Sequence, residues 1–179
     1  MLGDPRLPRT LWLATGVAWA ASSLILLARP TYWDPRTVLD WAAVIAYTVA
    51  WLLLAPSIVL VSRLAEARRA HFLGTAIALA AVVAGVANII EDGLGVAGAS
   101  EWYVYGILIA TVLLVPLAYL FARERALRLT GFCLALFLGI GFAAAGIGGL
   151  IILVLFGALA LRTEWFESRS APSAPEPAG

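Results

Sequence analysis

The sequence contains no lysine, one cysteine, one histidine and few charged residues of either sign. Only 13% of its 179 residues are charged, whereas about 25% is typical of soluble domains. Hydrophobic residues make up 63% of the chain, against about 45–50% in a soluble domain. These proportions exclude a soluble globule, a disordered chain and a nucleic-acid-binding module. We therefore expect an integral membrane protein with the lipid bilayer as its main partner and no nucleic acid.

The shortage of cysteine and histidine limits the chemistry that the chain can perform. A single Cys133 forms no internal disulfide, and its apolar neighbours predict a buried thiol. His71 has no second histidine or cysteine with which to bind a transition metal. A phosphate-binding loop, a nucleophile elbow, a zincin motif and a Cys-x-x-Cys pair are all missing. We therefore expect no metal and no cofactor, and we do not favour an enzyme. We read the absence of lysine as the bias of a GC-rich bacterial genome.

Charged residues mark the ends of apolar runs that are long enough to cross a bilayer. A crossing needs about 20 apolar residues in helical form. Backbone groups in lipid must be paired within their own segment, which favours helices over an open sheet. The sequence therefore predicts an all-α, polytopic transmembrane bundle over residues 11–162. Residues 1–10 precede it, and a disordered tail rich in Pro, Ser and Ala follows at 163–179. The six predicted helices are residues 11–28, 38–62, 72–91, 102–122, 130–145 and 147–161.

The last apolar run is too long for a single crossing. Residues 130–161 carry no charge, and as one helix they would be roughly 48 Å long at about 1.5 Å per residue. The glycines between Gly139 and Gly149 favour a break in this run. We expect two short helices that meet near Gly146–Gly149, with a turn below the membrane surface. The alternative is one long, tilted helix, which would give five helices in total.

The distribution of arginine predicts the orientation of the bundle. Basic residues collect on the cytoplasmic side of membrane proteins. The segment at 92–101 holds acidic residues and no basic one. We therefore expect the N-terminus on the cytoplasmic side of the plasma membrane and the acidic segment outside. The C-terminus would be cytoplasmic with six helices and external with five. The arginines that carry this assignment are Arg6, Arg9, Arg63, Arg68, Arg69, Arg123, Arg125 and Arg128.

The helix predicted at 72–91 has a stripe of small residues on one face. Small residues let two membrane helices approach closely. We expect this face to pack against another helix, either within the chain or from a partner. A partner would be a second copy or another membrane protein. The stripe consists of Gly74, Ala78, Ala81 and Gly85.

Polar residues gather at the outer end of that stripe. Asn88, Glu91 and Asp92 lie within one helical turn. Ionisable groups at membrane depth often mark functional sites, and neighbouring carboxylates repel each other. Asp40 and Glu101 begin the neighbouring helices at a similar depth. We therefore predict a candidate polar site of Asp40, Asn88, Glu91, Asp92 and Glu101.

A simpler interpretation of these polar residues stays open. The acids could solvate the helix ends or pair with Arg29 and Arg36 at the same level. Asn88 could then serve only as a hydrogen bond between helices. The two interpretations differ in whether a cavity lies behind the acids.

Aromatic residues on two helices predict the lining of a pocket. Tyr47 and Trp51 share a face of their helix with Asp40. Trp19 lies on a face of the helix predicted at 11–28 together with Thr15 and Ser22. If these faces meet, Trp19, Tyr47 and Trp51 line a pocket that opens outward toward the acids. The alternative places these rings in the core or against lipid.

Three classes of function remain compatible with this pattern. We favour a binding or accessory membrane protein with an outward-facing acidic site, because no motif demands another class. The second class is a small transporter or channel that uses intramembrane carboxylates. The third is an intramembrane enzyme on a lipid or isoprenoid, with Glu91 or Asp92 as general acid or base.

Overall fold

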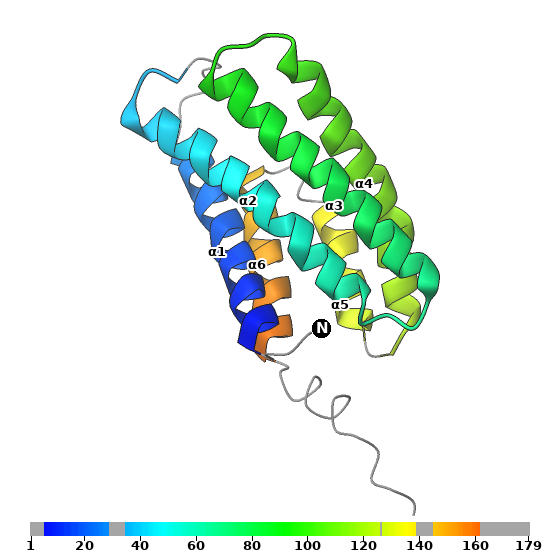
Figure 1. The fold of residues 1–179 in the computed structure, drawn as a ribbon. Helices are drawn as coiled ribbons and strands as arrows, with labels where there is room; N and C mark the ends of the chain where they lie inside the picture. Colours follow the sequence, from blue (N-terminus) through cyan, green and yellow to red (C-terminus); the bar gives the residue numbers. More distant parts are fainter. Residues whose placement is uncertain (1–5, 29–34, 126, 139–144, 162–179) are drawn as a thin grey trace, which may run out of the picture.

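The structure is a computed structural model that describes residues 6–28, 35–125, 127–138 and 145–161. This part of the chain forms helices and contains no strand (Figure 1). The predicted all-α bundle of six helices is confirmed. The elements are α1 (Arg6–Ala28), α2 (Val38–Ser62), α3 (Arg68–Asn88), the π-helical turn η1 (Ile89–Gly93), α4 (Ala99–Arg123), α5 (Arg128–Leu136) and α6 (Ala145–Leu161).

Four of these helices are long and apolar enough to cross a membrane, which indicates a multi-pass membrane protein. Their spans are Pro8–Ala28, Val38–Ser62, Arg68–Gly93 and Ala99–Arg123. By contrast, α5 has 9 residues and α6 has 17. At about 1.5 Å per residue, α5 is roughly 14 Å long, about half of a hydrocarbon core of about 30 Å. The two C-terminal helices therefore form a short pair beside four full-length ones.

The helix break in the last apolar run lies earlier than the sequence predicts. We expected a break near Gly146–Gly149, but α5 ends at Leu136 and α6 begins at Ala145. Gly149 lies inside α6, where the missing side chain lets α6 approach the Trp19 carbonyl and the Ser23 side chain of α1. Close packing against α1 thus keeps this glycine helical, in spite of its low helix propensity.

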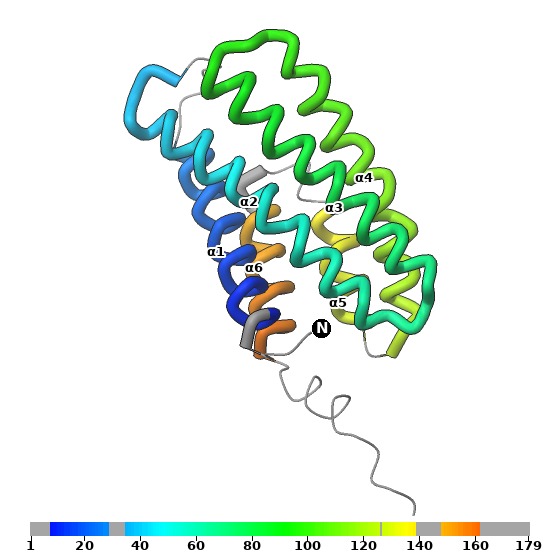
Figure 2. The backbone as a smooth tube through the Cα atoms, in the orientation of Figure 1, coloured from blue at the N-terminus to red at the C-terminus, as the bar shows by residue number. Residues whose placement is uncertain are grey.

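The six helices form a closed ring of neighbours. Each helix packs against the next one along the chain, and α6 packs against α1. Figures 1 and 2 show α1 and α6 side by side, with α2, α3, α4 and α5 forming the rest of the bundle. The start of α5 and the end of α6 lie at the same end of the bundle (Figure 1). At the opposite end of the bundle, the described helices are therefore α1, α2, α3 and α4, without α5 or α6.

The small residues of α3 pack within the chain. A side chain at Gly74 would meet Ser62 of α2, and one at Gly85 would meet Trp51 and Leu52 of the same helix. On α4, a Cβ at Gly106 would lie 2.8 Å from the backbone nitrogen of Ala84 of α3. The predicted small-residue face of α3 is therefore covered by α2, and glycine brings α3 and α4 together as well.

Candidate functional site

Asp40 lies in the first turn of α2 and helps to cap its N-terminus. Its side chain is 4% exposed, and its Oδ2 atom accepts hydrogen bonds from the backbone N–H groups of Arg36 and Thr37, at 3.1 and 2.9 Å. The Thr37 hydroxyl donates to the same oxygen and accepts from the Asp40 backbone N–H, at 2.9 and 3.2 Å. This reciprocal pair is a capping box, which satisfies backbone donors at a helix N-terminus. The carboxylate of Asp40 is thus engaged in beginning the helix.

Asn88 joins α3 to α2. Its side chain is 3% exposed, and its Nδ2 atom donates to the Thr48 hydroxyl at 3.0 Å and to the Val44 carbonyl at 3.4 Å. Hydrogen bonds of this kind hold helices together in membranes. These contacts agree with the simpler interpretation of Asn88 as a helix–helix hydrogen bond.

Glu91 and Asp92 lie in η1 at the rim of the bundle. Both are half-buried, and they line an open depression of about 480 Å³. The other lining residues are Pro35, Trp41, Gly93, Leu94, Gly95 and Ala97. The two carboxylates are close enough to Tyr103 to act electrostatically on its hydroxyl. Glu101 is exposed and is not among the residues that line this depression. The structure therefore brings together two of the five predicted polar residues in one depression.

The three predicted aromatic residues line one cavity. Trp19, Tyr47 and Trp51 surround a partly enclosed space of about 160 Å³. Its walls come from α1, α2, α4, the end of α5 and the start of α6. None of its described lining residues is charged, so the aromatic residues and the acids line two separate hollows rather than one pocket. The remaining lining residues are Ser23, Leu26, Leu54, Ile107, Ala110, Thr111, Leu114, Phe137, Gly148 and Gly149.

Trp19 is the centre of an aromatic cluster in this cavity wall. Its ring centroid lies 5.3 Å from that of Trp51, 6.0 Å from that of Tyr47 and 5.7 Å from that of Phe137. All three pairs are edge-to-face, an arrangement in which the positive edge of one ring meets the negative face of another. The cluster fixes the two indoles in place between α1, α2 and the end of α5.

Both indoles of the cavity wall have unsatisfied donors. Trp19 and Trp51 are each 5% exposed, and neither Nε1 atom has a hydrogen-bond partner within the described part of the chain. A buried donor without an acceptor costs about 1–3 kcal/mol, so such groups are rare in folded proteins. Both indoles belong to residues that line the cavity. This feature was not part of the sequence-based prediction, because periodicity identifies a face and not its hydrogen bonds.

A tyrosine pair connects the cavity wall to the acidic rim. The Tyr103 hydroxyl donates to the Tyr47 hydroxyl at 3.2 Å. Tyr47 lines the cavity, and Tyr103 lies within electrostatic reach of Glu91 and Asp92. The hydrogen bond therefore joins the cavity wall to Tyr103, which is not among the described lining residues of either hollow.

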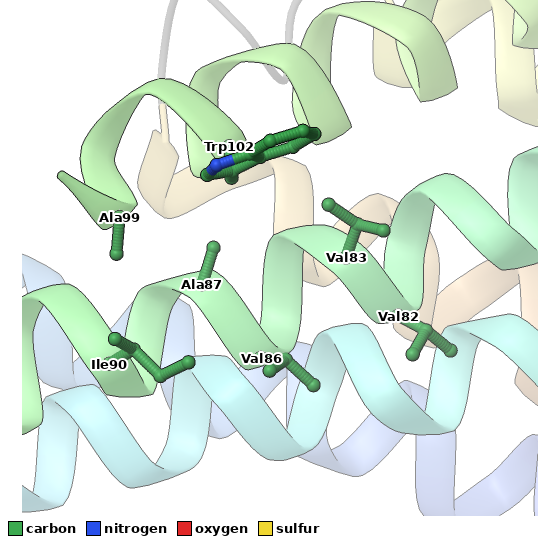
Figure 3. A pocket seen from close by; sticks show the side chains of 7 residues that line it. All are labelled: Val82, Val83, Val86, Ala87, Ile90, Ala99 and Trp102. Atoms are coloured by element: carbon green, nitrogen blue, oxygen red, sulfur yellow. The ribbon is translucent and has the colours of Figure 1, made fainter.

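A second, apolar depression lies on the outside of the bundle between α3 and α4. Figure 3 shows Trp102 of α4 above α3, with Val83 and Ala87 extending toward it. The depression measures about 320 Å³, and Trp102 is 65% exposed. The side chains of its described lining include no charged group and one polar atom, the indole nitrogen of Trp102. This surface suits lipid chains in general and gives no basis for selecting one ligand.

The part of the chain that the structure describes contains no candidate metal site. No three His, Cys, Asp or Glu side chains are grouped there in a way that could hold a metal ion. Cys133 is buried in α5, and the Nε2 atom of His71, at the start of α3, lies 3.0 Å from the Ala65 carbonyl oxygen.

Comparison with protein-family models, with curated proteins and with solved structures finds no match to this chain.

Proposed function

We propose that this chain is a multi-pass binding protein of a bacterial plasma membrane, which holds a lipid-soluble ligand in the aromatic cavity. The orientation in this proposal has the N-terminus in the cytoplasm. It is supported by the start of α1 and the arginine-rich α2–α3 and α4–α5 connections, which lie at one end of the bundle (Figure 1). The acidic segment around η1 lies at the other end and would face outward.

The observation that carries the proposal is the cavity. It is bounded by α1, α2, α4, the end of α5 and the start of α6. Its volume of about 160 Å³ resembles that of an engineered apolar cavity of about 150 Å³ that binds benzene. Aromatic and apolar side chains dominate its described wall, as in most small-molecule sites. A ring or a short hydrocarbon segment from a molecule dissolved in the bilayer fits these properties.

The two other classes receive less support. A carboxylate-driven transporter or a lipid enzyme needs an acid in the cavity, but Asp40 caps α2 and Asn88 binds Thr48. Glu91 and Asp92 line the separate depression at the rim. We assign them to an outward-facing acidic rim that is separate from the cavity.

The proposal is tested by filling the cavity, first with a small ligand and then with a larger side chain. We expect the bicyclic hydrocarbon indane to shift the indole N–H signals of Trp19 and Trp51 in ¹⁵N-labelled protein in nanodiscs. The variant Ala110→Leu adds carbons to the cavity wall and should abolish both shifts. Ala14→Leu, at an exposed position of α1, is the matched control and should preserve them. The other indole signals report whether each variant is folded. Absent shifts in the unaltered protein, or equal shifts in all three proteins, contradict the proposal.

A further inference from the structure

An exposed arginine and an exposed aromatic ring are paired on three helices at the arginine-rich end of the bundle. The two residues of each pair are four positions apart, so they share one face of their helix. In each pair the arginine is the terminal residue of its helix, and the ring lies about one turn further in. The pairs are Arg68 with Phe72 on α3, Arg123 with Tyr119 on α4, and Arg128 with Phe132 on α5.

The two residues of the pair on α4 are in direct contact. The guanidinium carbon of Arg123 lies 5.5 Å from the centroid of the Tyr119 ring, which is within the range of a cation–π interaction. Tyrosine rings favour the level of the lipid head groups, because one end of the ring is apolar and the other is polar. We therefore expect the guanidinium group above this exposed ring at the depth of the lipid phosphates.

The three helix ends belong to one surface. The middle helix, α4, packs against both α3 and α5. The backbone N–H of Glu66, in the α2–α3 connection, donates to both carboxylate oxygens of Glu124, at 3.2 and 3.3 Å. This contact holds the connection that precedes Arg68 against the end of α4 that carries Arg123. We call Arg68, Arg123 and Arg128, with their three rings, the arginine surface.

The pairing of arginine with an exposed ring distinguishes this end from the other. The rule that basic residues collect on one side of the membrane accounts for arginine here in general. It does not place an exposed ring one turn inside three terminal arginines. At the opposite end of α4, the exposed Trp102 follows Glu101 and has no arginine within four residues. The same helix thus presents its two exposed interfacial rings beside opposite charges.

The chemistry of the guanidinium group and its expected depth define the ligand. Arginine presents a planar fork of N–H donors that matches the oxygens of a phosphate. At this depth, the phosphate of a phospholipid can meet the guanidinium group while its acyl chains lie against the exposed ring. A zwitterionic lipid such as phosphatidylcholine also brings a quaternary ammonium group, which neighbouring guanidinium groups repel. An anionic phospholipid brings no such positive charge.

We infer that the arginine surface binds the head groups of anionic phospholipids, such as phosphatidylglycerol, in preference to zwitterionic ones. Arg68, Arg123 and Arg128 bind the phosphate, and the three rings set the depth of the guanidinium groups. This inference concerns a different part of the molecule from the cavity and does not depend on the ligand proposed there.

Native mass spectrometry of the protein in detergent micelles tests this preference. Titration with phosphatidylglycerol or with phosphatidylcholine of the same acyl chains gives the Kd of the first bound lipid. We expect phosphatidylglycerol to bind about fivefold more tightly, which is the effect of one arginine near an anionic head group. The triple variant Arg68→Gln, Arg123→Gln and Arg128→Gln should bind the two lipids with nearly equal affinity.

A second triple variant removes the same charge from the same end without altering the arginine surface. Arg6, Arg9 and Arg63 have no aromatic residue four positions away. Their replacement by glutamine should preserve the preference for phosphatidylglycerol. A large excess of glycerol 3-phosphate, a soluble phosphate without acyl chains, should not displace the bound lipid.

Equal affinity of the unaltered protein for the two lipids overturns the inference. Equal loss of the preference in the two triple variants also overturns it, because the total charge of this end would then be sufficient. Displacement by glycerol 3-phosphate would identify a site for free phosphate and overturn the assignment to a lipid. If the first triple variant does not fold, the three single variants decide, and each should lose part of the preference.

Discussion

The rim and the cavity of this bundle use their polar groups in opposite ways. At the rim, the buried Asp40 accepts three hydrogen bonds and the buried Asn88 donates two. Among the residues that line the cavity, Trp19 and Trp51 have buried N–H groups with no partner among the described residues. In a medium of low dielectric constant, a satisfied polar group stabilises the fold, and an unsatisfied one costs free energy. The two regions therefore differ in whether their buried polar side chains are paired within the described part of the chain.

The largest effect is expected from a substitution that disrupts the wall of the cavity. In Gly149→Ala the added methyl group would meet the Trp19 carbonyl and Ser23, so α6 must move away from α1. We expect a loss of about 1–3 kcal/mol in the free energy of unfolding, the usual cost of overpacking, and a loss of indane binding. Unfolding by sodium dodecyl sulfate in mixed micelles measures the first effect.

A second glycine of the same helix is the control for this change. A Cβ at Gly157 would meet nothing within 4 Å. Gly157→Ala should leave binding unchanged and be neutral or slightly stabilising, because alanine favours a helix over glycine by about 1 kcal/mol. Equal behaviour of the two variants would show that the α1–α6 contact does not shape the cavity.

A smaller effect is expected where the rim holds α2 and α3 together. Asn88→Leu removes the hydrogen bond to Thr48 at similar volume and should cost roughly 0.6–1.7 kcal/mol, the range measured for hydrogen bonds between membrane helices. Thr48→Val should cost a similar amount, and the double variant should cost less than the sum. Indane affinity should stay the same in all three. A change of affinity here would erase the distinction between rim and cavity.

The smallest effect is expected from the acids of the outer depression. Glu91→Gln removes a half-buried charge beside Asp92, outside the cavity wall. We expect the affinity for indane to change by less than about twofold and the free energy of unfolding by less than about 0.5 kcal/mol, as for most surface substitutions. Asp92→Asn serves as a parallel test. A loss of binding in either variant would bring the acids into the site and revive the transporter class.

The helix ends could be predicted because lipid excludes charge. The predicted range 38–62 coincides with α2, and the ranges for α3 and α4 differ from the structure by a few residues. The first helix begins at Arg6 rather than at residue 11, because a helix continues past the point where its sequence stops being apolar. The helical conformation of Gly149 was not predictable from glycine content, since it accompanies close packing of α6 against α1.

The candidate site was predictable only in part. Helical periodicity placed Trp19, Tyr47 and Trp51 on inward faces, and the structure brings them together. Which faces meet depends on the packing of the whole ring, so the contributions of Phe137 and of α4 were missed. The capping role of Asp40 did carry a sequence signal, the spacing of threonine and an acid three residues later.

The ring closes through helices that are far apart in the chain, and this sets an order of assembly. The helices α1 to α4 can enter the bilayer one after another as they leave the ribosome, because each is long enough to span it. The nine residues of α5 cannot span it alone, so the C-terminal pair must dock onto helices that are already inserted. Since α6 completes the wall opposite α1, the cavity exists only after the last helix has been made. A truncated or stalled chain would be inserted in the membrane but would lack the cavity.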